Sequence, residues 1–254
     1  MRIVSGWLLS VLLCAAASAV AQPKYAPDQG ASWTYAIHFA EVPETGCCRI
    51  AIEALSKSTV LESDGVVSNW RTALVSYAPA EGRDLDPTQR ELFFPQQRET
   101  EYAWSIAVTK LESVGANRQR QRMEFECDRY AIASFFPLGR TSLVRYPCVA
   151  RSFPSTGNAQ ESPPTFTTLA YGGTEDVHTS AGTFRTHKII MINGVKEDGE
   201  PQAYSAAVLI FFSDELGIPI RTEYAQRRRV WNAQGQTSGE VTTFVVREVV
   251  SFQR

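Results

Sequence analysis

Residues Thr183–Ile192 read TFRTHKIIMI, and residues Ala203–Phe212 read AYSAAVLIFF. Both segments are rich in β-branched and aromatic residues, which fit the pleated surface of a sheet. The first alternates at a period of two, with Phe184 and Ile190 on one face and Arg185 on the other. The second is apolar on both faces, which predicts a central strand covered on both sides. These two segments predict a β-sheet.

Strands of this kind repeat along the last third of the chain. Polar turns separate them, among them Asn193–Gly194, whose residues tolerate positive φ and favour a hairpin. Five strands in a row with no helical pattern between them predict an antiparallel meander. The five segments are Thr165–Val177, Thr183–Ile192, Ala203–Phe212, Ile218–Trp231 and Val241–Phe252. In the last segment the apolar residues in phase are Phe244, Val246, Val250 and Phe252.

The upstream half alternates in the same way and contains one helical signal. Asp86 is a good helix cap, Pro87 suits the first helical position, and about two turns follow up to Phe94. The fold class is therefore predicted as all-β, with an antiparallel sheet curved into a half-barrel or packed as a sandwich, and one short helix near residues 87–94. The upstream strand candidates are Ser32–Phe39, Cys47–Leu55, Val66–Tyr77, Glu101–Glu112 and Arg118–Tyr130.

The first 21 residues have the pattern of a secretory signal peptide. Arg2 precedes an apolar run, and the segment ends in the small residues Ala19–Val20–Ala21, which predicts cleavage near Ala21. An acylated Cys14 is the weaker interpretation, because Leu13 rather than a small residue precedes it. No later apolar run has the length of a membrane span. The mature chain is predicted to be periplasmic or secreted, with no transmembrane span.

The mature chain is long enough for one large β domain or two of ordinary size. We divide it into an N-terminal β region, residues 22–125, and a C-terminal β-meander domain, residues 126–254. The sequence leaves open a single integrated body, and also a duplication, because Gly30–Tyr35 and Gly139–Tyr146 are faintly alike.

The charge balance argues against nucleic acid as a partner. The formal net charge is −2, and it becomes −3 without the leader, which contains Arg2 and no acidic residue. A polyanion partner needs a strongly basic face. Two basic groups remain as possible contacts for an anionic partner, although a solvated sheet face is the favoured interpretation. They are Arg118, Arg120 and Arg122, and the run Arg227, Arg228 and Arg229.

Four cysteines remain after cleavage: Cys47, Cys48, Cys127 and Cys148. An even number in an exported chain indicates disulfides. Adjacent Cα atoms are about 3.8 Å apart, and disulfides usually need at least about 4.4 Å, so a bond between Cys47 and Cys48 is the least favoured. With that pairing excluded, each of these two residues is expected to bond to one of the later two.

Three segments resemble the motifs of a bacterial envelope family of unknown function. Glu175–Phe184 (EDVHTSAGTF) is similar to its E-x-V-x-x-P-A-G-T-F signature, and Phe212–Ile220 (FSDELGIPI) to its S-x-E-L-G turn. Phe136–Arg140 (FPLGR) resembles the start of its domain. The chain departs from the pattern at Ser180 and Ser142, where the family has Pro and Trp. Over residues 130–252 the resemblance implies a half-barrel like that of lipoprotein carriers, with no catalytic residues.

The sequence contains no motif of a nucleotide-binding protein, a metalloprotease or an α/β-hydrolase. We therefore predict no catalytic, cofactor-binding or metal-binding residues, and the three histidines, His38, His178 and His187, are interpreted as structural. The favoured hypothesis is a non-enzymatic envelope protein that binds an apolar, lipid-like or amphipathic ligand on the concave face of its sheet. The alternatives are a structural or assembly partner of another envelope protein, and an exported hydrolase.

Overall fold

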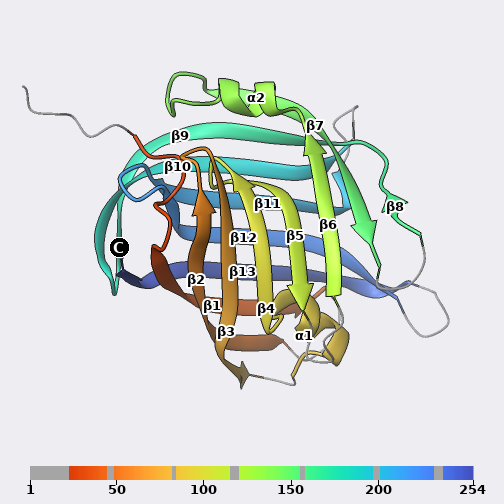
Figure 1. Ribbon diagram of the computed structural model, residues 1–254. Helices are drawn as coiled ribbons and strands as arrows, with labels where there is room; N and C mark the ends of the chain where they lie inside the picture. The colour runs from red at the N-terminus through yellow and green to blue at the C-terminus, as the bar shows by residue number, and fades with distance from the viewer. Residues whose placement is uncertain are drawn as a thin grey trace, which may run out of the picture.

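The computed structural model describes residues 23–44, 49–81, 84–114, 120–154, 158–196, 201–231 and 237–253. These residues form thirteen strands and two short helices, and all the strands belong to one antiparallel sheet (Figure 1). The strands are β1 (Ser32–Pro43), β2 (Ile50–Ser63), β3 (Val67–Glu81), β4 (Gln97–Ala103), β5 (Ala107–Val114), β6 (Arg120–Cys127), β7 (Leu143–Phe153), β8 (Gln160–Glu161), β9 (Thr165–Thr179), β10 (Gly182–Val195), β11 (Pro201–Ser213), β12 (Ile218–Trp231) and β13 (Thr237–Gln253). The prediction of an all-β, antiparallel fold is confirmed.

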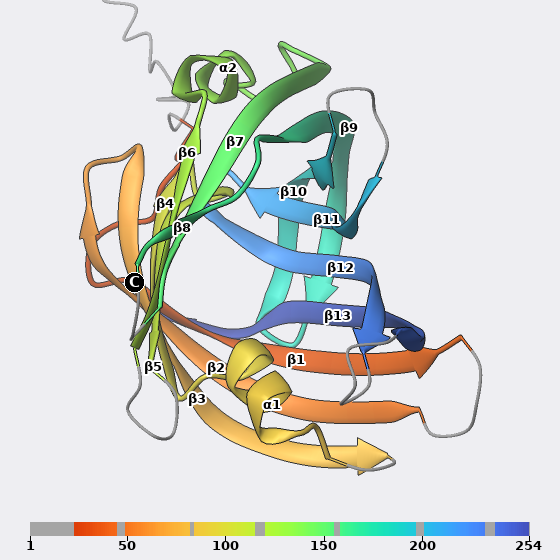
Figure 2. The same cartoon turned by 90° about the vertical axis from the view of Figure 1, so that its right-hand side faces the viewer.

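The sheet closes on itself. Its order is β6-β5-β4-β3-β2-β1-β13-β12-β11-β10-β9-β7-β8, and β6 also pairs with β7. Twelve strands therefore form a barrel (Figure 2), and the short strand β8 pairs with β7 beyond the segment of β7 that pairs with β9. The expectation of a half-barrel or a sandwich was wrong, because the strands at the two would-be edges pair over Arg122–Cys127 and Cys148–Phe153.

The C-terminal meander is present as predicted. Strands β9 to β13 are consecutive neighbours, and β11 lies between β10 and β12. The second face of β11 is only partly covered, since Phe211 is buried and Ala207 is exposed. Asn193–Gly194 forms no hairpin turn. Strand β10 continues to Val195 through an irregularity at which Gly194 has a φ of 71°.

The start and the end of the described chain lie side by side. Strand β1 pairs with β13 from Ser32 opposite Gln253 to Pro43 opposite Val241. The residue ranges 22–125 and 126–254 thus share one sheet, and the point that divides them falls inside β6.

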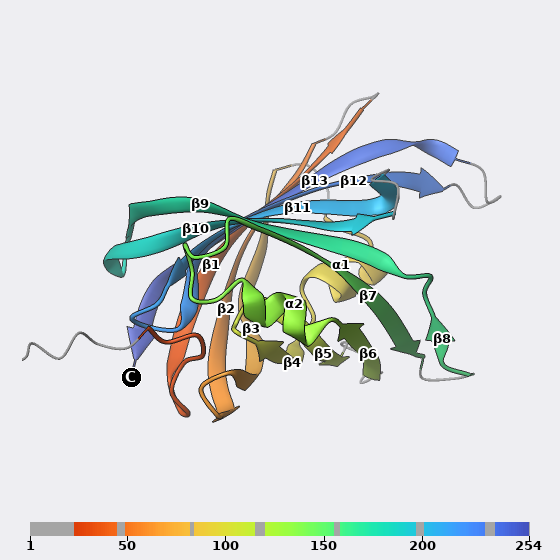
Figure 3. The same ribbon diagram turned by 90° about the horizontal axis from the view of Figure 1, so that it is seen from above.

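Each helix begins at an aspartate. Helix α1 (Pro87–Phe93) follows Asp86, whose carboxylate accepts a hydrogen bond from the Gln89 amide at 3.0 Å, as predicted. Helix α2 (Arg129–Ser134) was not predicted, and its first two residues were assigned to the strand candidate Arg118–Tyr130. The Asp128 carboxylate accepts from two amides of its first turn. The helices lie at opposite ends of the barrel, and from above both lie within the outline of the strands (Figure 3).

In the described part of the chain, no helix is long and apolar enough to cross a membrane.

Two clusters of buried side chains form the core. The first contains Trp33, Phe39 and Trp70, together with Phe94 from the end of α1. The second contains Leu169 and Phe212, together with side chains from α2 and the residue that follows it. Each helix therefore covers one end of the barrel with apolar side chains.

A disulfide joins β6 to β7 where the barrel closes. Cys127 and Cys148 are directly opposite in the ladder, with Cα atoms 4.2 Å apart. The expectation that each of them bonds to one of the earlier pair was wrong, because the register places them opposite each other. Cys47 and Cys48 lie outside the described residues.

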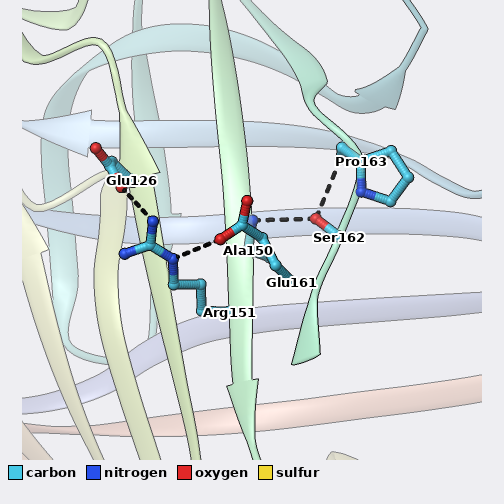
Figure 4. A network of polar contacts seen from close by, with 6 residues as sticks. All are labelled: Glu126, Ala150, Arg151, Glu161, Ser162 and Pro163. Atoms are coloured by element: carbon cyan, nitrogen blue, oxygen red, sulfur yellow. Dashed lines mark hydrogen bonds and ion pairs between the residues drawn. The ribbon is translucent and has the colours of Figure 1, made fainter. Parts of the chain in front are cut away.

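Polar contacts surround the same seam (Figure 4). Arg151 on β7 pairs with Glu126 on β6 at 3.2 Å and with Glu161 on β8 at 2.8 Å. The Ser162 hydroxyl accepts from the Ala150 amide at 3.1 Å, which holds β8 against β7. Exposed ion pairs contribute at most about 1 kcal/mol each, so the ladder and the disulfide account for most of the closure.

Candidate functional site

The interior of the barrel contains a cavity of about 610 Å³ that is partly open to solvent. This volume is within the range of small-molecule binding sites, roughly 300–1,000 Å³. Its wall is drawn from both halves of the chain, because strands β1 to β5 and β10 to β13 contribute to it together with α1. Most of the lining is apolar: Tyr35, Ile37, Phe39, Trp70, Leu74, Leu92, Phe93, Phe94, Tyr102, Ile106, Val108, Met191, Val208, Ile210, Tyr224 and Val245.

Strand alternation points these side chains inward. On β1, Tyr35, Ile37 and Phe39 line the cavity, whereas His38 between them is exposed. The same period of two on β11 places Val208 and Ile210 in the lining. The period-two alternation that favours strands therefore also places these apolar side chains in the cavity.

Helix α1 forms one end of the cavity. Its Phe93 packs against Phe39, with ring centroids 4.9 Å apart, and Phe94 packs against Tyr77 at 5.1 Å. Leu92 lines the cavity and is also 59% exposed. One face of the helix is therefore part of the wall while its end remains in contact with solvent.

The polar groups of the lining include two cations and no acid. Arg98 on β4 and Arg247 on β13 line the cavity, and none of the other lining residues in the described chain is Asp or Glu. Burial, and after it the nearby charge of Arg247, lower the pKa of Arg98 to about 10. The two guanidinium groups are therefore close enough to repel each other.

Each arginine has one stabilising contact in the described structure. Arg98 donates from Nη2 to the Leu92 carbonyl at 2.8 Å, one of the last carbonyls of α1. Arg247 lies over the ring of Tyr35, at 4.8 Å from its centroid. Tyr35 in turn donates its hydroxyl to the Pro219 carbonyl at 2.8 Å, and burial raises its pKa well above the ordinary value.

Donors without acceptors gather around the cavity. Among the described residues, six buried side-chain nitrogen or oxygen atoms have no hydrogen-bond partner, and four of them belong to cavity-lining residues. These four are Nε of Arg98, Nε of Arg247, Oγ of Ser56 and Oγ of Ser105. A buried polar group without a hydrogen-bond partner costs about 1–3 kcal/mol of stability. Four such atoms around one cavity therefore favour the interpretation of the cavity as a binding site.

The basic residues singled out from the sequence lie elsewhere. Arg120 pairs with Glu112 at 3.6 Å, and Arg122 pairs with Glu124. Arg227 on β12 pairs with Glu44 at 2.8 Å and with Glu240. The chain's own carboxylates thus already neutralise these cations, and β6 and β12 are not neighbours in the barrel. Arg118 and the side chains of Arg228 and Arg229 lie outside the described residues. A role for these two groups in binding a partner stays a prediction.

The histidines form local polar contacts. His187 is bonded through Nδ1 to the Tyr171 hydroxyl at 3.1 Å, and its Nε2 lies 3.2 Å from Asp214. His178 contacts the Thr183 hydroxyl at 2.8 Å. Within the described residues, no group of three His, Cys, Asp or Glu side chains is arranged to hold a metal ion.

Sequence reasoning missed Arg98 and Arg247. Arg98 lies in a polar stretch, Gln96–Glu101, that resembles an exposed strand. The sequence does contain a feature that could have identified Arg247. This residue interrupts the apolar run Thr243–Val250 at a position in phase with Val245 and Val249. A single arginine in phase with core residues is the pattern that would have identified it.

Comparisons with known proteins do not assign this chain to a family. No protein-family model matches the chain, and no curated protein matches it. A structure of a protein named as exported, with a YmcC-like fold, from Bacteroides fragilis is 11% identical, covers 91% of this chain and 99% of its own, and has a TM-score of 0.36. A protein named as a lipoprotein from Parabacteroides distasonis is 9% identical, with coverage of 91% and 99% and a TM-score of 0.36.

A DUF1329 family protein from Desulfovibrio piger is 9% identical, covers 89% of this chain and 85% of its own, and has a TM-score of 0.31. At these TM-scores the likenesses carry no argument about this chain. The resemblance of Glu175–Phe184 and its companion motifs to an envelope family therefore stays a prediction.

Proposed function

We propose that this chain is an exported, non-enzymatic envelope protein that binds an apolar or amphipathic ligand inside its barrel. The observation that carries the proposal is the cavity of about 610 Å³ with its mostly aromatic and aliphatic wall. Apolar side chains that face a void lose dispersion contacts, and a ligand restores them. Removing apolar surface from water contributes about 25 cal/mol per Å², so a lipid-like chain is a favourable occupant.

Two features support export. Residues 1–21 have the charged start, apolar run and small-residue end of a signal peptide. Cys127 and Cys148 form a disulfide, and such bonds persist in oxidising compartments such as the periplasm. An envelope location would also provide apolar and amphipathic ligands in quantity.

The proposal is tested by filling the cavity. Met191 lines the cavity, and Met191→Trp places a large ring in it; its neighbour Ile192 is 41% exposed, so Ile192→Trp is the matched control. We expect the wild type and Ile192→Trp to bind a neutral apolar fluorophore such as N-phenylnaphthylamine. Met191→Trp should bind it about tenfold or more weakly, since each 1.4 kcal/mol of lost contact is a factor of ten.

Native mass spectrometry of protein isolated from a periplasmic extract without detergent provides the second measurement. A lipid-sized mass on the wild type and on Ile192→Trp, absent from Met191→Trp, is the expected result. Equal loading and equal fluorophore affinity in all three proteins would show that the cavity is not the binding site.

A further inference from the structure

We infer that the ligand carries an anionic head group, a carboxylate or a phosphate on an apolar chain, and that Arg98 and Arg247 bind this head group inside the cavity. The inference rests on the proposed function, because it describes the polar end of the same ligand. It goes further in assigning two residues and a charge to the site.

The first argument is the charge of the cavity. The chain as a whole has a formal net charge of −2, yet the described lining contains two cations and no acid. Several arginines outside the cavity have carboxylate partners: Arg71 pairs with Glu99 at 2.9 Å, and Arg151 pairs with Glu126 and Glu161. A buried charge is costly unless it is paired and hydrogen-bonded. No described residue of the lining supplies the counter-charge, and an anionic ligand would supply it.

The second argument is geometric. Arg98 on β4 and Arg247 on β13 come from strands with three others between them, yet both line the same cavity, and the charge of Arg247 lowers the pKa of Arg98. Two like charges that converge without a carboxylate between them form a ready-made site for an oxyanion. Guanidinium groups suit this role because their planar N–H donors match both oxygens of a carboxylate or phosphate.

The third argument is the number of unused donors. Among the described residues, Arg98 contacts the Leu92 carbonyl through Nη2, Arg247 lies against the Tyr35 ring, and Nε of both arginines has no hydrogen-bond partner. The hydroxyls of Ser56 and Ser105, in the same lining, also have no partner within this part of the chain. The guanidinium N–H groups and the two hydroxyls can thus all donate to an oxyanion, and the described lining contains no carboxylate to compete for them.

The rest of the cavity suits a chain and not a bare ion. Ile37, Phe39 and Leu74 line it on one side, and Met191, Val208 and Ile210 on another. An inorganic ion would leave these apolar walls without contacts. An amphiphile fills both parts of the site at once.

The experiment compares ligands that share a chain and differ in the head. Dodecanoate, dodecyl phosphate and dodecanol are titrated into the wild type, each displacing N-phenylnaphthylamine. The two anions are kept below their critical micelle concentrations, and dodecanol below its solubility limit. We expect the two anions to bind at least about tenfold more tightly than the alcohol, as charge-assisted hydrogen bonds require. Acetate and inorganic phosphate, which have the head without the chain, are expected to displace nothing.

Variants assign the preference to the two arginines. Arg98→Met and Arg247→Met should each bring the anions to within about threefold of dodecanol while keeping the alcohol's affinity. Arg71→Met, an exterior arginine on the neighbouring strand β3, should behave as the wild type. The two inward variants also control for each other, because a folding defect in one leaves the other to be measured, and circular dichroism identifies it.

The outcomes separate this inference from the proposed function. Equal affinity of the wild type for dodecanoate and dodecanol would overturn the inference and leave apolar binding intact. No binding of any of the three would overturn both. Displacement by inorganic phosphate as strong as by dodecyl phosphate would show a simple ion site and overturn the amphiphile. Preference for the anions that survives both substitutions would place the head group elsewhere.

Discussion

Arg98 has a charge that the fold itself disfavours. Its pKa falls from 12.5 in the open chain to about 10, mainly because of burial. Below about pH 10 the arginine is protonated in both states, and the folded state bears the cost of the buried charge. That cost disappears as the pH rises from about 10 to 12.5, where only the unfolded state stays protonated. At neutral pH the residue therefore lowers stability, which is common for groups that serve binding.

Arg98→Met is expected to raise the free energy of unfolding at pH 7 by about 2 kcal/mol. A shift of about 2.5 pKa units corresponds to roughly 3 kcal/mol, and loss of the hydrogen bond to the Leu92 carbonyl offsets about 1 kcal/mol of it. Urea denaturation followed by circular dichroism measures the change. Arg71→Met, which removes an exposed pair, should stay within about 0.5 kcal/mol of the wild type. A less stable Arg98→Met protein would show that the charge is compensated in the fold.

The sequence predicted where the strands lie in the chain, but it did not always predict which face of a strand points into the barrel. In β13 the apolar residues Phe244 and Val246 share a phase, yet Phe244 is 45% exposed, whereas Val245 lines the cavity and Val249 is fully buried. A shift of one residue exchanges the two faces of a strand, and both faces of β13 are rich in valine. Hydrophobicity alone therefore does not identify which face of β13 lines the cavity, and Arg247 on that face was missed.

Short sequence motifs predicted the structure correctly where their residues act directly on the backbone. Asp86 and Pro87 correctly predicted α1, because a carboxylate acceptor and a fixed φ both favour a helix start. The same signal at Asp128 was overlooked because the residues before it alternate. Asn193–Gly194 misled in the opposite way, since its positive φ serves an irregularity within β10 and not a turn.

The pairing of β6 with β7 is expected to depend on the disulfide. This ladder contains six residue pairs, and the Cys127–Cys148 bond, across a sequence separation of 21, lies at one end of it. Replacing both cysteines by serine should lower the free energy of unfolding by about 3 kcal/mol, because the open chain gains loop entropy. Urea denaturation with and without reductant is the measurement, and the reduced wild type should match the variant. Identical midpoints for the oxidised wild type and the variant would show that the bond adds nothing to closure.

At the scale of the whole molecule, alternation predicts that strands exist but not which strands meet. Residue patterns correctly indicated consecutive neighbours in the meander, where short turns connect the strands. They gave no indication that β1 pairs with β13 or β6 with β7, because no local signal encodes a partner far along the chain. The cavity depends on both of these pairings, since its wall combines β1–β5 with β10–β13.

We propose that the ranges 22–125 and 126–254 fold only together. Residues 126–254 alone would leave β13 without β1 and β7 without nearly all of β6, and would expose the half of the cavity wall that β10–β13 provide. The fragment should show no cooperative urea transition and should bind a hydrophobic dye, even though it contains both Cys127 and Cys148 and can form their disulfide. The control is residues 22–254, which should unfold in one transition. A fragment that unfolds cooperatively by itself, without binding dye, would show that residues 126–254 form an independent domain, and the cavity would then lie between two separable parts.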